Sequence, residues 1–448
     1  MKRFMRNYSK DEIKGVSLFN NLVIIAQSVI FALLLINAFR ANTVPGVVIL
    51  GAAMVIPFFL KPTEITAYIV GFSMMGTGIQ VAYIALTCII SLLIKSKMKN
   101  ITLISIFVFT IYELLHIITS PSDNLTEFLR YIIIYFLLFY IMFIDYEKQD
   151  KIRVVDSYIY GTIFSILHIF VETLLIFDGN LLKYVDGTFR FGYAEQLETD
   201  LTMAADPNLV GQSCSFVIVF CIALIMLGYK NKKYYLSMVI ALLAGTLTIS
   251  KTFLLSIVLI FVLMILFVGS WNSVKMMKRR VLLLIIVLLG CFVVLKVNPS
   301  YLDNIFSRVD TTDITTGRTA NASIYLEYLM NKGENLLFGV GMQNVGEKIG
   351  FSGSPHAAII EGVVCWGLIG VLLMLALIIA SVKHNTAYVK SKMLNYIPLI
   401  IFSVLIQTTQ LFRLRDRVIA LIVVIVLTGI SQKGDETNEC QKKRIIGD

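Results

Sequence analysis

Charged residues are scarce in this chain of 448 residues. Asp, Glu, Lys and Arg make up 15% of it, whereas roughly a quarter of a soluble domain is charged. This scarcity excludes a soluble globular fold. Hydrophobic residues make up 57% of the chain, and apolar runs of roughly 20 residues recur from end to end. We therefore predict an all-α integral membrane protein, with residues 1–448 as a single polytopic membrane domain.

Cysteine is also scarce, and none falls in a long hydrophilic segment. Five of the six cysteines lie within apolar runs, and Cys440 lies in the polar tail. This placement excludes a disulfide framework or a zinc site readable from spacing, so we interpret the five as small core residues. No small-residue cleavage site follows the first apolar run, which begins near Leu18. We expect this run to be a retained membrane span.

Internal repeats, low-complexity tracts and a separate soluble domain are absent from the sequence. A transporter more often shows two related halves, with its cations near the middle of the membrane, so the lack of a repeat disfavours that class. A membrane sensor would need a soluble output domain, and the chain after Ser431 is only a short tail, 432–448. The net charge of +10 would suit nucleic acid. However, the basic residues cluster in short connections between apolar runs, as membrane insertion requires, so we expect no nucleic-acid partner.

These basic connections set the predicted topology. They are 1–18, 95–100, 146–155, 229–234, 270–280, 383–393 and the tail after Ser431. If all are cytoplasmic, an even number of spans separates each pair, which gives about fourteen spans with both termini in the cytoplasm. After the span 19–39, residues 45–94 supply three short crossings, broken by KPTE at 61–64 and GTG at 76–78. A re-entrant pair within 45–76 is the alternative.

The later spans are predicted in pairs. They are 101–120 with 127–145, 156–177 with 208–229, 234–250 with 252–269, 281–297 with 359–382, and 394–411 with 416–431. Two long hydrophilic segments then face outward, loop one at 178–207 and loop two at 298–358. Every other connection is short, and long inserts among tight hairpins usually carry function.

Loop two contains the clearest candidate residues. TTGRTANASIYLEYLM predicts an amphipathic helix that begins at Thr315 or Thr316, with Ile324, Leu326 and Leu329 on one side. LLFGVGMQNVG predicts a glycine turn, which alone is a weak signal for phosphate binding. His356, one of four histidines, stands where the loop re-enters the membrane. Glu361 follows near the start of the next helix.

Several cations face outward, against the positive-inside trend. They are Arg190 in loop one, Lys251 in LTISKT, Arg318 in TGRT, and Arg413, Arg415 and Arg417 in LFRLRDR. Ionisable residues at membrane depth indicate function, and arginine and lysine bind phosphate or diphosphate through charge-assisted hydrogen bonds. The alternative is that they bind the headgroups of outer-leaflet membrane lipids or extend towards water.

The order TGRT, LLFGVG and PHAAIIEGVVCWGLIG resembles the signature of the O-antigen ligase and Wzy-type polysaccharide polymerase superfamily. ADPNLVG at 205–211 and LTISKT at 247–252 resemble two further elements of that family. Lys251 stands in place of an arginine, and Ala357 stands where asparagine is common. The motifs cover a small part of the chain, while the number of spans and the placement of the loops match along its whole length.

The resemblance implies a GT-C-like glycosyltransferase of the bacterial cytoplasmic membrane, inverting and independent of metal or other cofactor. Its substrates would be undecaprenyl-diphosphate-linked oligosaccharides, which a polymerase joins on the outer face of the membrane. A flippase and a chain-length regulator are the candidate protein partners. The close alternative is a ligase that moves the finished glycan to a lipid A core or another acceptor. The alternative from another class is a flippase for the same lipid-linked sugars.

The residues are compatible with this chemistry. His356 would take the proton of the acceptor hydroxyl, since imidazole titrates near neutral pH. Glu361 would orient the His356 ring, or would only complement the positive start of its helix. Arg190, Lys251 and Arg318 are expected to converge on the diphosphate, with Arg413 and Arg415 as further members, and to stabilise the departing charge in place of a metal. The outer loops contain no tight Asp-x-Asp, so no metal site is predicted.

Two histidine–glutamate pairs each have two possible interpretations. Glu113 with His116, and His168 with Glu172, are spaced to share a helix face near the outer side. Each pair either makes structural hydrogen bonds or lines the cavity for the acceptor. Asp206, which precedes Pro207 and Asn208, is expected to cap the helix that follows.

Overall fold

The computed structural model describes most of the membrane domain. The described ranges are 22–39, 44–75, 81–119, 125–176, 190–192, 206–267, 318–331, 333–343, 345–351, 355–387, 393–408 and 415–432, with isolated residues at 278, 281, 285, 353, 389 and 411. Within these ranges the secondary structure is entirely helical. Most of the predicted span 281–297, most of loop one, residues 298–317 of loop two and both termini lie outside the described residues.

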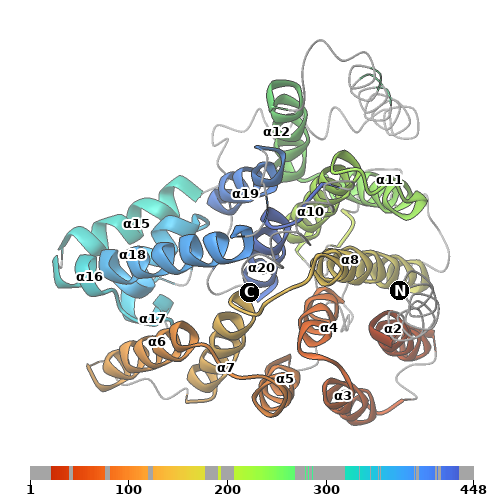
Figure 1. The fold of residues 1–448 in the computed structure, drawn as a ribbon. Helices are drawn as coiled ribbons and strands as arrows, with labels where there is room; N and C mark the ends of the chain where they lie inside the picture. The colour runs from red at the N-terminus through yellow and green to blue at the C-terminus, as the bar shows by residue number, and fades with distance from the viewer. Residues whose placement is uncertain are drawn as a thin grey trace.

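The helices form one bundle, in which α10 and α20 occupy the middle (Figure 1). Those of the N-terminal half are α2 (Leu22–Phe39), α3 (Gly46–Val55), η1 (Ile56–Phe59), α4 (Pro62–Met74), α5 (Val81–Lys95), α6 (Asn100–Thr119), α7 (Leu125–Met142) and α8 (Lys148–Ile176). Those of the C-terminal half are α10 (Pro207–Met226), α11 (Lys232–Leu247), α12 (Lys251–Phe267), α15 (Arg318–Asn331), α16 (Gly333–Phe338), α17 (Val345–Ile349), α18 (Ala358–Thr386), α19 (Met393–Leu405), η2 (Ile406–Thr408) and α20 (Arg415–Thr428).

Five of the described helices, α6, α7, α8, α10 and α18, are long and apolar enough to cross a membrane. Further helices are equally apolar but shorter, among them α2, α5, α12 and α20. These helices are those of a helical membrane protein. Every described helix from α6 to α12, and from α18 on, overlaps a predicted span. The number of fourteen spans and the GT-C-like fold stay predictions.

Residues 45–94 form separate short helices, as their polar interruptions predict. Within this stretch lie α3, which continues into η1, and then α4 and α5. α4 begins after Lys61 because Pro62 occupies its first position and the Glu64 carboxylate accepts from the Lys61 amide at 2.9 Å. GTG at 76–78 lies outside the described residues. Whether these helices cross the membrane or re-enter it stays a prediction.

Small residues let the helices of this bundle approach closely. A Cβ atom added at Gly161 of α8 would lie 2.1 Å from the carbonyl oxygen of Gly71 in α4. Close backbone approach at glycine is typical of helix packing inside membranes, where hydrophobic burial does not drive association. The four described cysteines are buried, as expected of core residues.

Those basic connections that the structure describes meet at one end of the bundle. The contacts are Lys99 Nζ with Asp145 at 2.6 Å, Lys233 Nζ with Asp156 at 2.6 Å, and Lys151 Nζ with the carbonyl oxygens of Asn385 at 2.9 Å and Gly429 at 3.0 Å. They join the connections near 99, 145–156, 233, 385 and 429, as the parity argument requires. The helices α10, α12, α18 and α20 all begin at the opposite end. That the basic end faces the cytoplasm stays a prediction.

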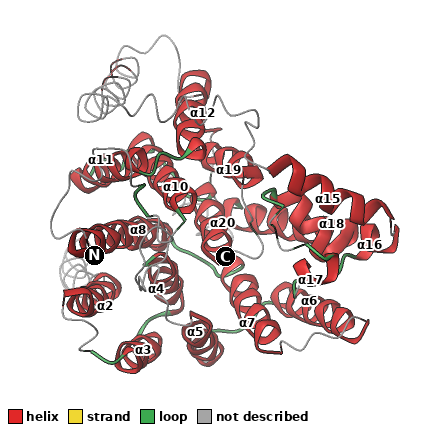
Figure 2. Cartoon of the chain, turned by 180° about the vertical axis from the view of Figure 1, so that it is seen from behind, coloured by secondary structure: helices red, strands yellow, loops and turns green. Residues whose placement is uncertain are grey.

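α18 differs from the single continuous span predicted at 359–382. Gly367 has φ 64° and ψ −177° inside this helix, a combination that is essentially restricted to glycine. The break divides α18 into a nine-residue segment, 358–366, which we call the arm, and a longer segment after Gly367. Figure 2 shows α15 and α16 alongside α18, at one edge of the bundle.

The buried side of α15 differs from the predicted one. Tyr325 and Leu329 are each 1% exposed, whereas Ile324 is 37% and Leu326 is 47% exposed. Residues four apart share a helix face, so Tyr325 and Leu329 point the same way, while Ile324 and Leu326 are two apart and do not. The predicted apolar side of this helix is therefore wrong for Ile324 and Leu326.

Candidate functional site

Three of the sequence elements singled out above meet at the start of α10. The Arg190 guanidinium donates from Nε to the carbonyl oxygen of Thr248 at 2.9 Å and from Nη2 to Oδ1 of Asn208 at 3.4 Å. The Ser250 hydroxyl donates to the same Oδ1 at 3.2 Å. We call Arg190, Asn208, Thr248 and Ser250 the Arg190 cluster. It joins loop one and ADPNLVG, which overlap in sequence, with LTISKT, whose Ser250 is 42 residues beyond Asn208.

Local chemistry explains why the chain folds in this way around Asn208. The Asp206 carboxylate accepts from the Asn208 amide at 2.8 Å, and Pro207 occupies the first helical position of α10, which confirms the predicted cap. The segment 190–192 of loop one also contacts the end of α11, since the Phe191 amide donates to the carbonyl oxygen of Leu247 at 3.0 Å. Gly192 has φ 87°, and a Cβ there would lie 2.9 Å from the Val210 side chain.

Lys251 is the first residue of α12 and follows a tight turn. Ile249 in this turn has φ 49°, an uncommon conformation for a β-branched residue. Gly211 of α10 makes room for the turn, because a Cβ there would lie 3.0 Å from the Thr248 hydroxyl and 3.1 Å from Ser250. Lys251 thus lies next in sequence to the Arg190 cluster. A lysine at a helix start opposes the helix dipole, so the position favours a bound anion.

Arg417 also reaches the start of α10, from the side of α20. It is 1% exposed, and its guanidinium donates to the carbonyl oxygen of Leu209 at 2.9 Å and to the Ser213 hydroxyl at 3.2 Å. The same group lies 5.6 Å from the ring centre of Phe216. Sequence reasoning noted Arg417 only beside its neighbours in LFRLRDR and did not assign it to the site. The feature of the sequence that could have indicated a role for Arg417 is its position at the start of an apolar helix.

Glu361 binds the connection between α19 and α20, in which Arg413 lies. Its carboxylate is buried and accepts from the Leu411 amide at 2.7 Å. The Ile359 amide, also on the arm, donates to Oε1 of Gln407 at 3.4 Å. The arm therefore lies against the connection between α19 and α20, a role of Glu361 that sequence reasoning missed. That Glu361 orients the His356 ring stays a prediction.

His356 lies two residues before α18 and is partly buried. Its φ of 48° is positive, which is uncommon outside glycine although histidine is among the residues that tolerate it. Strained backbone of this kind persists where surrounding structure holds it, and it clusters at functional sites. His356 thus lies at the junction of loop two and the arm.

For three of the cations predicted to bind the diphosphate, the structure describes the backbone alone or nothing. Arg318 begins α15 and Arg415 begins α20, but their side chains lie outside the described part of the chain. Arg413 lies wholly outside it. Their convergence on one anion with Arg190 and Lys251 therefore stays a prediction.

The glycine turn of LLFGVG binds protein backbone rather than presenting free amides to a phosphate. The amides of Gly339, Val340 and Gly341 donate to the carbonyl oxygens of Asn335, Val364 and Cys365, each at 2.8 Å. On the far side of the turn, Lys348 Nζ donates to the carbonyl oxygen of Val340 at 2.8 Å. Burial lowers the pKa of Lys348, and the nearby Glu113 carboxylate opposes that shift. The turn is thus a docking element for the arm.

The two histidine–glutamate pairs predicted within helices have different surroundings. Glu113 and His116 of α6 bind the glycine turn and the arm: Glu113 accepts from Trp366 Nε1 at 2.8 Å, and His116 Nε2 lies 2.9 Å from the carbonyl oxygen of Phe338. This favours the structural interpretation for that pair. In α8, His168 Nε2 lies 3.3 Å from the Glu172 carboxylate, and both residues are buried.

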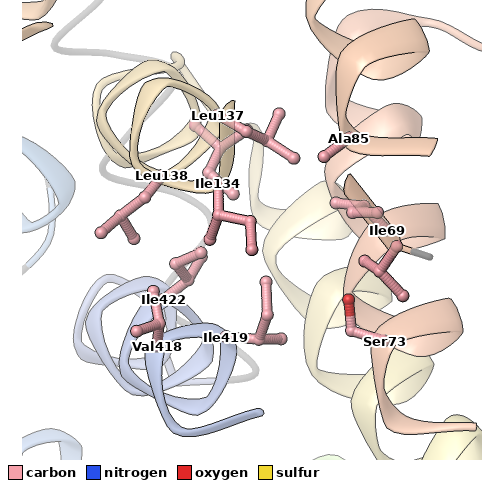
Figure 3. A pocket seen from close by; sticks show the side chains of 11 residues that line it. Ile69, Ser73, Ala85, Ile134, Leu137, Leu138, Val418, Ile419 and Ile422 are labelled. Atoms are coloured by element: carbon pink, nitrogen blue, oxygen red, sulfur yellow. The ribbon is translucent and has the colours of Figure 1, made fainter. Parts of the chain in front are cut away.

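An apolar pocket opens between α4, α5, α7 and α20 (Figure 3). Its lining is aliphatic apart from Ser73, and includes Leu137, Val418, Ile419 and Ile422. Val418 directly follows Arg417, so the pocket begins beside the start of α20, at the end of the bundle where the Arg190 cluster lies. The cavity is small, about 10 Å³, which is room for about one water-sized molecule.

Among the described residues, no three or more His, Cys, Asp or Glu side chains are grouped to hold a metal ion. Arg190 and Arg417 contact the start of α10, and Lys251 begins α12 next in sequence to the Arg190 cluster. Glu361 lies on the arm, and His356 lies just before it. This arrangement can bind a phosphate-bearing group and offer a base beside it. In comparisons with known proteins, no family model and no curated protein matches the chain.

Proposed function

We propose that the chain is a membrane glycosyltransferase that joins undecaprenyl-diphosphate-linked oligosaccharide repeat units on the outer face of the bacterial cytoplasmic membrane. The observation that carries the proposal is the meeting of Arg190, Ser250 and Arg417 around the first turns of α10. Arginine in a low-dielectric setting suits a diphosphate, because its planar group donates two parallel hydrogen bonds.

The reaction follows from two groups of residues. The acceptor hydroxyl attacks the anomeric carbon of the donor sugar, and its proton passes to a ring nitrogen of His356. The new carbon–oxygen bond forms as the bond to the diphosphate breaks, and the electron pair leaves with the diphosphate. Attack from the face opposite the leaving group inverts the anomeric centre. Arg190 and Lys251, with Arg318, Arg413 and Arg415, stabilise the departing charge as preorganised cations.

The aliphatic residues that follow Arg417 are compatible with a lipid-borne substrate. A polyprenyl diphosphate has an anionic head and a long hydrocarbon tail, so its site needs cations beside an aliphatic surface. The pocket-lining residues Val418 and Ile419 directly follow Arg417 in α20.

The decisive experiment measures elongation by purified protein in lipid with lipid-linked repeat units as the only sugar source. Arg190→Ala should reduce the rate by roughly 30- to 1,000-fold, because removing one donor to a leaving group costs on the order of 2–4 kcal/mol. Arg153→Ala is the matched control, since Arg153 is a partly buried arginine whose Nη1 lies 2.9 Å from Asp150 at the basic end. Equal rates in the two variants would remove Arg190 from the site.

The products formed in cells separate polymerisation from ligation. Cells whose only copy carries His356→Ala should accumulate single lipid-linked repeat units, because making and flipping the donor do not depend on this chain. Accumulation of long, unattached polymer would instead identify a ligase.

A further inference from the structure

The break at Gly367 frees three carbonyl groups at the end of the arm. In a continuous helix the carbonyl oxygens of Val364, Cys365 and Trp366 would accept from amides four residues later. Each of these hydrogen bonds would span Gly367, whose φ of 64° and ψ of −177° are not helical. Backbone groups left without partners in a membrane are costly, so the break requires other donors.

α6 and the glycine turn supply these donors. The amides of Val340 and Gly341 donate to the carbonyl oxygens of Val364 and Cys365, each at 2.8 Å. The Tyr112 hydroxyl lies 2.7 Å from the carbonyl oxygens of both Trp366 and Phe338, so its proton bridges the arm and the turn. All three freed groups are thereby satisfied.

The Glu113 carboxylate adds a second connection between the same two elements. One oxygen accepts from Trp366 Nε1 at 2.8 Å and the other from the Met342 amide at 3.2 Å. Glu113 is 1% exposed, and the Trp366 ring packs edge-on against Phe109 and Tyr135. We call Tyr112, Glu113 and the turn 339–342 the latch.

The latch holds the C-terminal end of the arm, while Ile359 and Glu361 hold its other end, next to the proposed base, against the connection between α19 and α20. The arm of nine residues, 358–366, is about 13 Å long at 1.5 Å per residue. A rotation of about 10° at the latch would therefore move the far end by about 2 Å. An error of about 1 Å in catalytic geometry can lower a rate by on the order of 100-fold.

We propose that Tyr112 and Glu113 are positioning residues that set the direction of the arm, and through it the place of His356. The effect on glycan elongation rests on the proposed function, whereas the direction of the arm does not. Neither Tyr112 nor Glu113 belongs to the Arg190 cluster. Loss of the latch should therefore misplace His356 and leave binding of the donor intact.

A cysteine reporter tests the direction of the arm without any activity. Ala357→Cys would be introduced into a chain in which Cys291 and Cys440 are serine, because the other four cysteines are buried. The alkylation rate of this cysteine would be compared in folded protein carrying Tyr112→Phe, Glu113→Gln or Tyr229→Phe. Tyr229→Phe is the matched control, since that hydroxyl donates to the carbonyl oxygen of Ser431 at 2.9 Å, at the basic end.

Both latch variants should change the alkylation rate by about tenfold, because a displaced arm alters the surroundings of its first residues. The control should leave the rate unchanged. Unchanged alkylation in both latch variants would overturn the proposal. Trp366→Phe removes the indole N–H donor to Glu113 together with part of the buried ring, and it replaces any latch variant that fails to fold.

The kinetic measurement uses the same variants with lipid-linked repeat units. Per folded molecule, kcat should fall by about 10- to 100-fold, while KM for the donor changes by less than about twofold. A merely structural role would lower the amount of folded protein and leave kcat per folded molecule unchanged, which would also overturn the proposal. If no protein elongates glycan, the unaltered chain included, the proposed function fails, and the alkylation result still decides the positioning role.

Discussion

Gly367→Ala tests the break in α18 directly. The native backbone at this position has φ 64° and ψ −177°, and a Cβ there would lie 2.1 Å from the carbonyl oxygen of Leu337. Alanine can therefore be accommodated in two ways only. Either the break is kept with a strained backbone and a displaced Leu337, or α18 straightens and the contacts of the arm with the glycine turn are lost.

Each route has an estimable free-energy cost. Keeping the break places a non-glycine residue in a region that costs about 1–3 kcal/mol, before the clash with Leu337 is relieved. Straightening α18 regains its own helical bonds but leaves the buried amides of Val340 and Gly341 without acceptors, at about 1–3 kcal/mol each. Because the cheaper route prevails, we expect Gly367→Ala to lower the free energy of unfolding by about 2–3 kcal/mol.

The assay is reversible unfolding of the purified chain in mixed micelles as the fraction of denaturing detergent is raised. Gly51→Ala is the matched control: Gly51 lies inside α3, and a Cβ there meets nothing within 4 Å. That variant should be neutral or gain up to about 1 kcal/mol, because alanine favours helix over glycine. If the two variants unfold at the same detergent fraction, the break is not held by the contacts described, and the reasoning fails.

Three further predictions concern the site and the topology. His356→Gln should stop elongation at normal protein abundance, because glutamine can hold a hydroxyl but cannot take its proton; long polymer made at the usual rate in cells would make the histidine a positioning residue and Glu361 the next candidate base. Arg190→Lys should elongate more slowly than the unaltered chain yet faster than Arg190→Ala, because lysine keeps the charge and loses the planar donor pair; equal rates for the two variants would count against a planar contact. Single cysteines at Glu195 and Lys332, in a chain whose Cys291 and Cys440 are serine, should react with a membrane-impermeant thiol reagent on intact cells, and labelling only after permeabilisation would reverse the topology.

The sequence by itself determined the class of protein and the position of most helices. Membrane insertion demands long apolar runs and leaves cations in the connections, so both features are visible in the linear sequence. The start of α10 was equally local, because Asp206 and Pro207 act on the turn that directly follows them. The resemblance singled out ADPNLVG and LTISKT separately, and the contact between them, of Asn208 with Ser250, became visible only in the structure.

Tertiary structure alone decided what the glycines and the buried polar residues do. Nothing local distinguishes Gly367, which breaks α18, from Gly51, which lies in a regular helix. The difference comes from Tyr112, Glu113 and the turn at 339–342, which are far away in sequence and satisfy the groups that the break frees. Likewise Glu361 accepts from Leu411, fifty residues further on. A hydrogen bond between distant segments depends on how the helices pack, so the periodicity of either segment does not predict it.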